Sequence, residues 1–380
     1  MNTFTGQEHG PGGSKQPASK FTAPANTSTD QWVETCASLG ATYAVFTAKH
    51  EEGFMNFLTN ATDYNIGNTP FCESRKAAGQ SCDLVADFLK SCDKFGLDRG
   101  LYFVRAAMDL EPSARGLSFR CSQTYFDGDC KTHQPPIKDC SAMLRSAFTD
   151  LASNYGPIKQ FWFDHGDGLF MDLITTHQPD AVILGREWDL VGTEGGFVRY
   201  GLPQWYPAFT KDVPSAGVTP SVNYSGFSGS AISTSGSPYA PYWRARQCDT
   251  SLSSSGWFWH NGGAPRRNAS DGVDTYYMQC VGMGAGLILN MPPSTRGVLE
   301  PPFVSWASAF KAEIQRRYGH PAGVTNGSVS TADTGVEPRP GLVLELAGCQ
   351  PIDTVIVRED LSLGQRIVRQ QQPPLTSPEI

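Results

Sequence analysis

The chain has 380 residues, of which 39% are hydrophobic and 18% are charged, and its formal net charge is −7. This balance is typical of a globular protein with room for one large core, and the acidic charge argues against nucleic acid as a main partner. The sequence contains no apolar run long enough to span a membrane. The 39 glycines and 27 prolines indicate many loops.

Strand-like and helix-like segments alternate along most of the chain. We expect strands at Ala41–Thr47, Leu101–Val104, Lys159–Asp164, Ala181–Gly185 and Gly286–Asn290. We expect helices at Leu84–Cys92, Ser141–Tyr155, Asp172–His177, Tyr276–Met283 and Pro301–Tyr318. Apolar strands that alternate with helices predict a parallel α/β sheet, and this length favours a (β/α)8-like TIM barrel. A doubly wound sheet is the alternative, but no G-x-G-x-x-G sequence opens a helix.

The character of the chain changes after Tyr318. Residues 319–339 are rich in Gly, Thr, Ser and Pro and are expected to form a linker. Leu342–Glu345 and Thr354–Arg358 are strand-like, but too few strands follow to bury a sandwich core. We therefore expect residues 1–318 to form the barrel domain and residues 340–380 to be the start of a truncated C-terminal β-sandwich.

The cysteines and the glycosylation sequons bear on the compartment. None of the ten cysteines forms a C-x-x-C pair, so a zinc ribbon is not expected. Cys72 and Cys82, like Cys121 and Cys130, bracket short polar stretches and suit local disulfides, although the full pairing cannot be deduced. Five N-x-S/T sequons occur, at Asn26, Asn60, Asn223, Asn268 and Asn326. Together these features favour a secreted or lysosomal/vacuolar protein.

No signal peptide opens the chain, because its first residues have neither a basic start nor an apolar core. Either the protein is cytosolic or the N-terminal segment is missing. We favour the second alternative.

The most informative segment is Phe161–Gly168, in which an aromatic run ends in Asp164 and glycines follow at once. A turn at Tyr155–Pro157 precedes it, so the strand should begin at about Ile158. The carboxyl end of a barrel strand is where barrel enzymes hold catalytic groups. Asp164 is therefore a candidate nucleophile, metal ligand or structural cap, whereas Asp167 is expected to be a loop residue in the glycine turn.

A second carboxylate, Glu194, follows the next predicted strand and would face the same mouth of the barrel. Two carboxylates at one mouth, close to aromatic residues, suit glycoside hydrolysis. One attacks the anomeric carbon, and the other donates and later accepts a proton. The alternative is that Asp164 caps a loop and Glu194 is a solvated loop acid.

Further candidates surround this mouth. His50 follows the strand Ala41–Thr47 and could donate a hydrogen bond to a sugar hydroxyl, or could be a loop histidine bonded to backbone. Trp257 and Trp259 have the same parity, so an extended segment would present both as a sugar-stacking platform; aromatic residues in such a loop more often close a core. Trp162 shares the strand face of Asp164 and could form a pocket wall.

A metal site is not expected at this mouth. The ligand set of His50, Glu51 and Glu52 is poorly spaced for a metal ion. No G-x-S-x-G, Walker A or H-E-x-x-H motif occurs either, and we expect neither a metal nor another cofactor.

These segments, in this order, resemble family 29 glycoside hydrolases, the α-L-fucosidases, and look closest to the plant and bacterial branch that cleaves α-1,3/4-linked fucose. The resemblance runs from Met1 to about Tyr318. It rests on the ordered matches Met1–Gly10 (MNTFTGQEHG), Thr47–Phe54 (TAKHEEGF), Tyr155–Gly168, Glu187–Gly196 (EWDLVGTEGG), Trp243–His260, which is similar to "WVPAECDVSIRPGWFWH", and Gly286–Gly297 (GLILNMPPSTRG).

The resemblance implies a retaining exo-α-L-fucosidase that acts on a fucosylated oligosaccharide or glycoprotein. Asp164 would be the nucleophile that forms a covalent glycosyl-enzyme intermediate, and Glu194 would be the general acid and then the general base. The implied pocket residues are Glu8, His50, Glu51, Trp162, Trp257 and Trp259.

The sequence departs from the family pattern at several pocket positions. Glu51 replaces the second His of "TAKHHDGF", Leu190 replaces the Trp of "WVGNE", and Gln247 replaces the Glu of "PAEC". Both catalytic carboxylates are kept, so we expect activity. The alternatives are a fucose- or glycan-binding protein on the same barrel, and a hydrolase for a related 6-deoxy or galacto-configured sugar.

Family members also have a strand and a fucose-binding His before the segment that Met1–Gly10 resembles. The barrel is therefore expected to lack its first strand in this chain. Linkage preference and oligomeric state do not follow from the sequence.

Overall fold

The computed structural model describes residues 17–50, 53–104, 140–164, 169–185, 194–198, 204–206, 242–244 and 247–321. Its central feature is a parallel sheet of four strands in chain order, namely β1 (Tyr43–Lys49), β2 (Asp98–Val104), β3 (Gln160–Asp164) and β4 (Val182–Leu184). A second parallel pair joins β7 (Gln247–Ser251) to β8 (Gly286–Asn290). An antiparallel pair joins β5 (Gln204–Tyr206) to β6 (Tyr242–Arg244). The predicted α/β class with parallel strands is confirmed, and the strands described form separate sheets rather than a closed ring.

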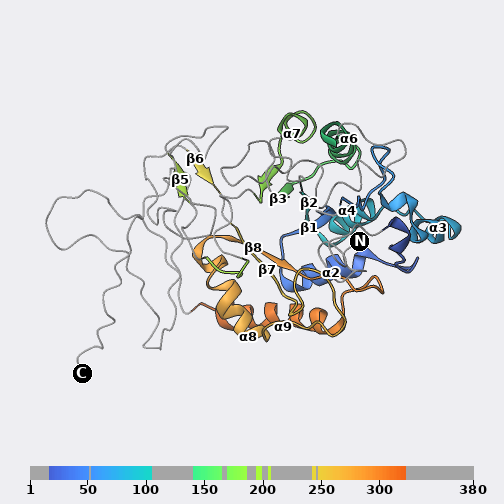
Figure 1. The fold of residues 1–380 in the computed structure, drawn as a ribbon. Helices are drawn as coiled ribbons and strands as arrows, with labels where there is room; N and C mark the ends of the chain where they lie inside the picture. The colour runs from blue at the N-terminus through green and yellow to red at the C-terminus, as the bar shows by residue number, and fades with distance from the viewer. Residues whose placement is uncertain are drawn as a thin grey trace, which may run out of the picture.

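Helices pack on both sides of these strands. Their bounds are α2 (Thr29–Leu39), α3 (Pro70–Ala77), α4 (Leu84–Phe95), α6 (Cys140–Ser153), α7 (Met171–His177), α8 (Ala269–Gly272) and α9 (Pro301–Tyr318). Short turns of other helix types are η2 (Ala18–Lys20), η3 (Ile66–Asn68), the π-helical η5 (Val273–Tyr277) and η6 (Val281–Met283). Figure 1 shows α6 and α7 on one side of the molecule and α8 and α9 on the opposite side, with the parallel strands between them.

The amphipathic helix α4 illustrates why these segments fold as they do. Asp83 caps its N-terminus by accepting a hydrogen bond from the backbone N–H of Ala86, and Gly96 ends it in the left-handed conformation. Its buried side chains, among them Val85, Phe88 and Leu89, join the main hydrophobic core. The helix therefore covers one face of β1 and β2 with a continuous apolar stripe.

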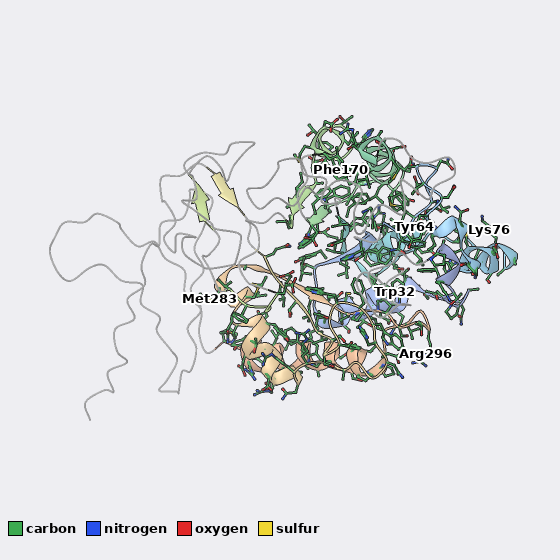
Figure 2. The ribbon with its side chains drawn as sticks, viewed as in Figure 1. Trp32, Tyr64, Lys76, Phe170, Met283 and Arg296 are labelled. Carbon is green, nitrogen blue, oxygen red and sulfur yellow. A yellow bond between two sulfur atoms is a disulfide. The ribbon has the colours of Figure 1, made fainter. Side chains whose placement is uncertain are left out.

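Alternation along β3 decides which side chains reach the core and which reach the site. Phe161 and Phe163 pack against Phe148 of α6, with ring centroids 5.3 and 5.6 Å apart. Phe170, which directly precedes α7 and is labelled in Figure 2, has its ring centroid 4.5 Å from that of the same Phe148. Because side chains alternate along a strand, Trp162 and Asp164 face the other side of the sheet. The side chains on the outer face of β3 thus belong to an aromatic core, and those on its inner face are available for a functional site.

The predicted elements are confirmed with small shifts in their bounds. The strand predicted at Lys159–Asp164, with a start expected at about Ile158, begins at Gln160. By contrast, β8 and α9 have the predicted bounds. The segment Tyr276–Met283, predicted as a helix, is the end of a π-helix followed by a 3-10 turn. Its Gly282 and the left-handed Gly284 explain why no regular helix continues there.

Two disulfides lie in the described residues. Cys72–Cys82 is the predicted local bridge. Cys248–Cys280 was not predicted, and it links β7 to the turn that precedes β8. Cys121 and Cys130 lie outside the described residues. Residues 322–380, which include most of the predicted linker and both predicted sandwich strands, also lie outside them. Within the part of the chain that the structure describes, none of the helices has the length and apolar character that crossing a membrane requires.

Candidate active site

Asp164 is the last residue of β3 and lies at the carboxyl end of the four-stranded sheet. The hydroxyl of Tyr102, on β2, donates a hydrogen bond to Asp164 Oδ2 at 2.8 Å. Asp164 is therefore a half-buried carboxyl group with one oxygen held in a fixed direction.

Three aromatic rings lie side by side across the inner face of the same sheet. The Tyr102 ring stacks on Trp162, with centroids 5.2 Å apart and an interplanar angle of 15°. On its other side, Tyr102 stacks on His50, with centroids 5.6 Å apart and an angle of 8°. The stack joins the ends of β1, β2 and β3 into one wall beside Asp164. Tyr102 was not among the predicted site residues. The available signal was that Tyr102 and Val104, two residues apart in β2, lie on the same face of the strand.

The segment Glu194–Val198 reaches the same region by a different route. Backbone bonds anchor it, from Gly196 N to Asp249 O at 3.0 Å and from Val198 N to Gln279 O at 2.7 Å. A Cβ at Gly196 would lie 2.6 Å from Tyr276 and 2.7 Å from Thr250, so only glycine permits this approach. Glu194 itself has φ 53°, in the left-handed region that residues with side chains rarely adopt.

Trp257 lies next to this acid. Its indole Nε1 donates to Glu194 Oε2 at 3.4 Å, which is long for a hydrogen bond. Asn290, the last residue of β8, holds the Trp257 backbone carbonyl at 2.8 Å. The neighbouring Phe258 packs edge-on against His50, with centroids 5.1 Å apart. Trp259 is half-buried. That the side chains of Trp257 and Trp259 face the same side of the segment stays a prediction.

Gln247 connects the two parallel sheets across the site. Its side-chain oxygen accepts a hydrogen bond from Trp162 Nε1 at 3.1 Å, and its amide nitrogen lies 3.4 Å from the Tyr43 hydroxyl. Burial raises the pKa of Tyr43 to about 12, so this hydroxyl stays neutral. A neutral amide can accept from one partner and donate to the other, which a carboxylate cannot do. The replacement of the family's glutamate by Gln247 therefore fits its surroundings.

A third carboxyl group, Asp249, lies in the middle of β7. Its side chain is 5% exposed. Burial raises the pKa of Asp249 to about 7, and the negative charges of Glu194 and Asp164 add to the effect. Among the described residues, no group hydrogen-bonds to its Oδ1. Asp249 was not among the predicted site residues, although it occupies the position of the Asp in the motif that Trp243–His260 resembles.

Apart from Trp259, the predicted site residues divide into three groups. The structure gathers Asp164, His50 and Trp162 along one sheet edge, and Glu194 with Trp257 beside it. Glu8 and Glu51 lie outside the described residues, as does Asp167, which was expected to be a loop residue. The described residues contain no group of three His, Cys, Asp or Glu side chains arranged to hold a metal ion.

An aspartate at the carboxyl end of a parallel strand, with a glutamate on a nearby loop and a wall of stacked aromatic rings, fits an α/β glycoside hydrolase. The sequence profile of the alpha-L-fucosidase family matches residues 13–310, so the chain belongs to this family. The resemblance inferred from the motifs is confirmed.

Proteins that are similar to this chain agree with its membership of the alpha-L-fucosidase family. Alpha-L-fucosidase 1 of Arabidopsis thaliana is 29% identical over 312 residues, which are 78% of this chain and 53% of that protein. A Ruminococcus gnavus GH29 fucosidase in complex with fucose has a similar fold, with a TM-score of 0.62 and 21% identity over 84% of this chain and 64% of that one. A glycoside hydrolase 29 family member from an unknown rumen bacterium gives a TM-score of 0.61 and 21% identity, over 86% and 56%. The chain spans about half the length of the curated relatives it matches.

Proposed function

We propose that this chain carries the active site of a retaining exo-α-L-fucosidase, and that its two parallel sheets belong to one (β/α)8-like barrel. The observation that carries the proposal is the convergence of Asp164 and Glu194. They come from a strand end and from a separate loop. Asp164 bonds to Tyr102, which stacks on His50. His50 packs against Phe258, the neighbour of the Trp257 that donates to Glu194. Two acids that meet beside an aromatic wall are what double-displacement glycoside hydrolysis requires.

In the proposed first step, the Asp164 carboxylate attacks the anomeric carbon while Glu194 gives its proton to the departing glycosidic oxygen. The bond between the sugar and that oxygen breaks, and a fucosyl ester of Asp164 forms. The Tyr102 hydroxyl supports this role, because its hydrogen bond to Asp164 Oδ2 fixes the orientation of the nucleophile.

In the proposed second step, Glu194 takes a proton from water as the water oxygen attacks the anomeric carbon. The ester bond to Asp164 breaks and fucose is released. Trp257 Nε1 points at the Glu194 carboxylate, which supports its position through both steps.

The stacked rings supply the proposed sugar pocket. His50 could donate a hydrogen bond to a hydroxyl of the sugar, as its place at the end of β1 suggests. The apolar faces of Trp162 and Tyr102 would bury the methyl group of fucose. The fucose in the complex of the Ruminococcus gnavus relative supports this substrate class.

Fucose release tests the proposal directly. The purified chain is incubated with p-nitrophenyl α-L-fucoside and with a Lewis-type trisaccharide, and liberated fucose is measured by chromatography. Release from either substrate, with the α-anomer as the first product, is the expected result. Fucose binding without release would instead favour a glycan-binding protein.

We further propose that the chain passes through a secretory route. The disulfides Cys72–Cys82 and Cys248–Cys280 suit an oxidising compartment. The asparagines of the sequons within the described residues, Asn26, Asn60 and Asn268, are all exposed, as residues that carry N-linked glycans must be. Expression through a eukaryotic secretory pathway should give a product whose mass falls on treatment with peptide N-glycosidase, and an unchanged mass would contradict the proposal.

A further inference from the structure

The indole of Trp162 is held by three contacts. Tyr102 stacks on it, with ring centroids 5.2 Å apart. A Cβ at Gly185, just beyond β4, would lie 2.5 Å from Trp162 Cδ2, so only glycine permits this approach. The third contact is the hydrogen bond that Trp162 Nε1 donates to Gln247 Oε1 at 3.1 Å. Trp162 is 6% exposed, so loss of this amide would leave a buried N–H without a partner.

This hydrogen bond is the first of three in series. Gln247 Nε2 donates to the hydroxyl oxygen of Tyr43 at 3.4 Å, and the Tyr43 hydroxyl donates to the backbone carbonyl of Leu287 at 3.1 Å. Trp162 and Tyr43 belong to β3 and β1, whereas Gln247 and Leu287 belong to β7 and β8. Each of the three bonds therefore joins one parallel sheet to the other.

The two ends of the series fix its direction. The indole N–H of Trp162 can only donate, and the carbonyl of Leu287 can only accept. Tyr43 keeps its proton, because burial raises the pKa of its hydroxyl to about 12, and it gives that hydrogen to Leu287. The side chain at position 247 must therefore accept from Trp162 and donate to Tyr43. An amide does both, whereas an ionised carboxylate only accepts.

The orientation of Trp162 reaches the proposed nucleophile through one ring. Tyr102 stacks on Trp162 at an interplanar angle of 15°, and its hydroxyl donates to Asp164 Oδ2 at 2.8 Å. The stack sets where the phenol ring lies, and the ring sets where its hydroxyl points. A tilt of the indole should therefore displace the group that orients Asp164.

We propose that Gln247 is a positioning residue of the fucosidase reaction, which holds the Trp162–Tyr102 stack through this directed series of hydrogen bonds and so orients Asp164. This role rests on the proposed function. The motif that Trp243–His260 resembles has a glutamate at this position, so the need for an amide is a property of this chain.

The first test is Gln247→Met, which keeps the length of the side chain and removes both of its hydrogen bonds. With p-nitrophenyl α-L-fucoside, kcat should fall about tenfold while KM stays within about threefold, because orientation of the nucleophile counts in the transition state. The indole N–H resonance of Trp162, assigned by its absence from Trp162→Phe, should move upfield in a nitrogen–proton correlation spectrum as its hydrogen bond is lost.

Gln178→Met is the matched control. Gln178 is also a buried amide that bonds in both directions, since it accepts from Ile158 N at 2.9 Å and donates to the carbonyl of Ala152 at 2.7 Å. Ile158 precedes β3, so these bonds lie at the opposite end of the strand from Asp164. Gln178→Met should lower the free energy of unfolding, but should leave kcat and the Trp162 resonance unchanged.

A second variant, Gln247→Glu, covers the case in which Gln247→Met does not fold. A protonated carboxyl group can accept from Trp162 and donate to Tyr43 as the amide does, whereas the ionised form cannot. The titratable groups on the four strands that the series joins are Tyr43 and Lys49 on β1, Asp164 on β3 and Asp249 on β7, with none on β8.

The surroundings of position 247 favour the protonated form. Lys49 donates to the backbone carbonyls of His50 and Val104, at the far end of β1 from Tyr43. Burial and the acidic groups Asp164 and Asp249 should both raise the pKa of a carboxyl group placed there. The kcat of Gln247→Glu should therefore lie within about threefold of the unaltered chain at about pH 5, and should fall at least about tenfold below it at about pH 8.

Three results would each overturn the role of Gln247 and leave the fucosidase proposal intact. They are an unmoved Trp162 resonance in Gln247→Met, a kcat in that variant no lower than in Gln178→Met, and a Gln247→Glu activity ratio that does not change with pH. Absence of fucose release by the unaltered chain would overturn both proposals.

Discussion

The two acids of the site are held in opposite ways. Asp164 ends a strand whose outer face is packed into an aromatic core, and its carboxylate is fixed by Tyr102. Glu194 is exposed, adopts a left-handed backbone and is anchored through backbone bonds of Gly196 and Val198. A nucleophile must meet one carbon atom at one distance, whereas a proton donor must release and recover a proton. The rigid strand end and the looser loop suit these two tasks.

The largest expected effect is at the strand end. Asp164→Ala removes the proposed nucleophile, so kcat/KM should fall at least about ten-thousandfold on every substrate. The free energy of unfolding should change little, because Asp164 lies at the edge of the core. Steady-state kinetics with both substrates and urea unfolding check the two statements. A variant that keeps a tenth of its turnover would remove Asp164 from the nucleophile role.

On the loop side, the effect should depend on the substrate. Glu194→Ala should lower kcat/KM for the trisaccharide about a thousandfold, because a sugar leaving group needs a proton. The loss should be far smaller for p-nitrophenyl α-L-fucoside. Parallel assays on the two substrates give the ratio, and equal losses would count against Glu194 as the acid.

Between the two acids, Asp249 should make stability depend on pH. Its pKa is raised from 3.8 to about 7 in the folded state, so the folded chain binds the proton more tightly than the unfolded chain does. Its contribution to stability is complete below about pH 4 and is lost as the pH rises toward 7. The shift corresponds to at most about 4 kcal/mol, and relaxation around the buried charge should reduce this to roughly 2 kcal/mol.

Asp249→Asn should therefore be more stable than the unaltered chain at pH 8 and about equally stable at pH 4, as measured by urea unfolding at both values. A stability difference that does not change with pH would show that Asp249 does not hold a proton in the folded state.

The smallest expected effect is at the hydrogen bond that orients the nucleophile. Tyr102→Phe keeps the ring stack but removes the hydroxyl from Asp164, and should lower kcat/KM about tenfold. Tyr155→Phe is the control, since the Tyr155 hydroxyl donates to Asp83 at 2.6 Å, at the N-terminus of α4. It should affect stability and not turnover. Equal effects of the two variants on kcat would refute the orienting role of Tyr102.

Most of the fold could be predicted where apolar periodicity was strong. The strand Gly286–Asn290 and the helix Pro301–Tyr318 were predicted with the bounds they have, because both are bounded by glycine or proline. By contrast, β7 (Gln247–Ser251) was missed, although all five of its residues are buried. It is a polar segment whose burial depends on partners from β3 and β8, and local sequence carries no signal of them.

The site residues, too, divide into those that local sequence predicted and those that it did not. Asp164 and Trp162 followed from one strand and its alternation, and Glu194 from the motif order. Tyr102 and Asp249 were missed because their surroundings form between strands, from a stack of rings in one case and from burial among acidic groups in the other. Contacts of this kind depend on register and twist, which a single sequence does not specify.

The disulfide Cys248–Cys280 reaches further than the two strands it joins. Cys248 lies between Gln247, which accepts a hydrogen bond from Trp162 of β3, and the buried Asp249. Cys280 directly follows Gln279, whose carbonyl accepts the hydrogen bond from Val198 N. One covalent bond thus links the strand that carries Asp249 to the segment whose Gln279 carbonyl holds the Glu194 loop. Reduction of this disulfide should therefore change the geometry of the site as well as the stability of the fold.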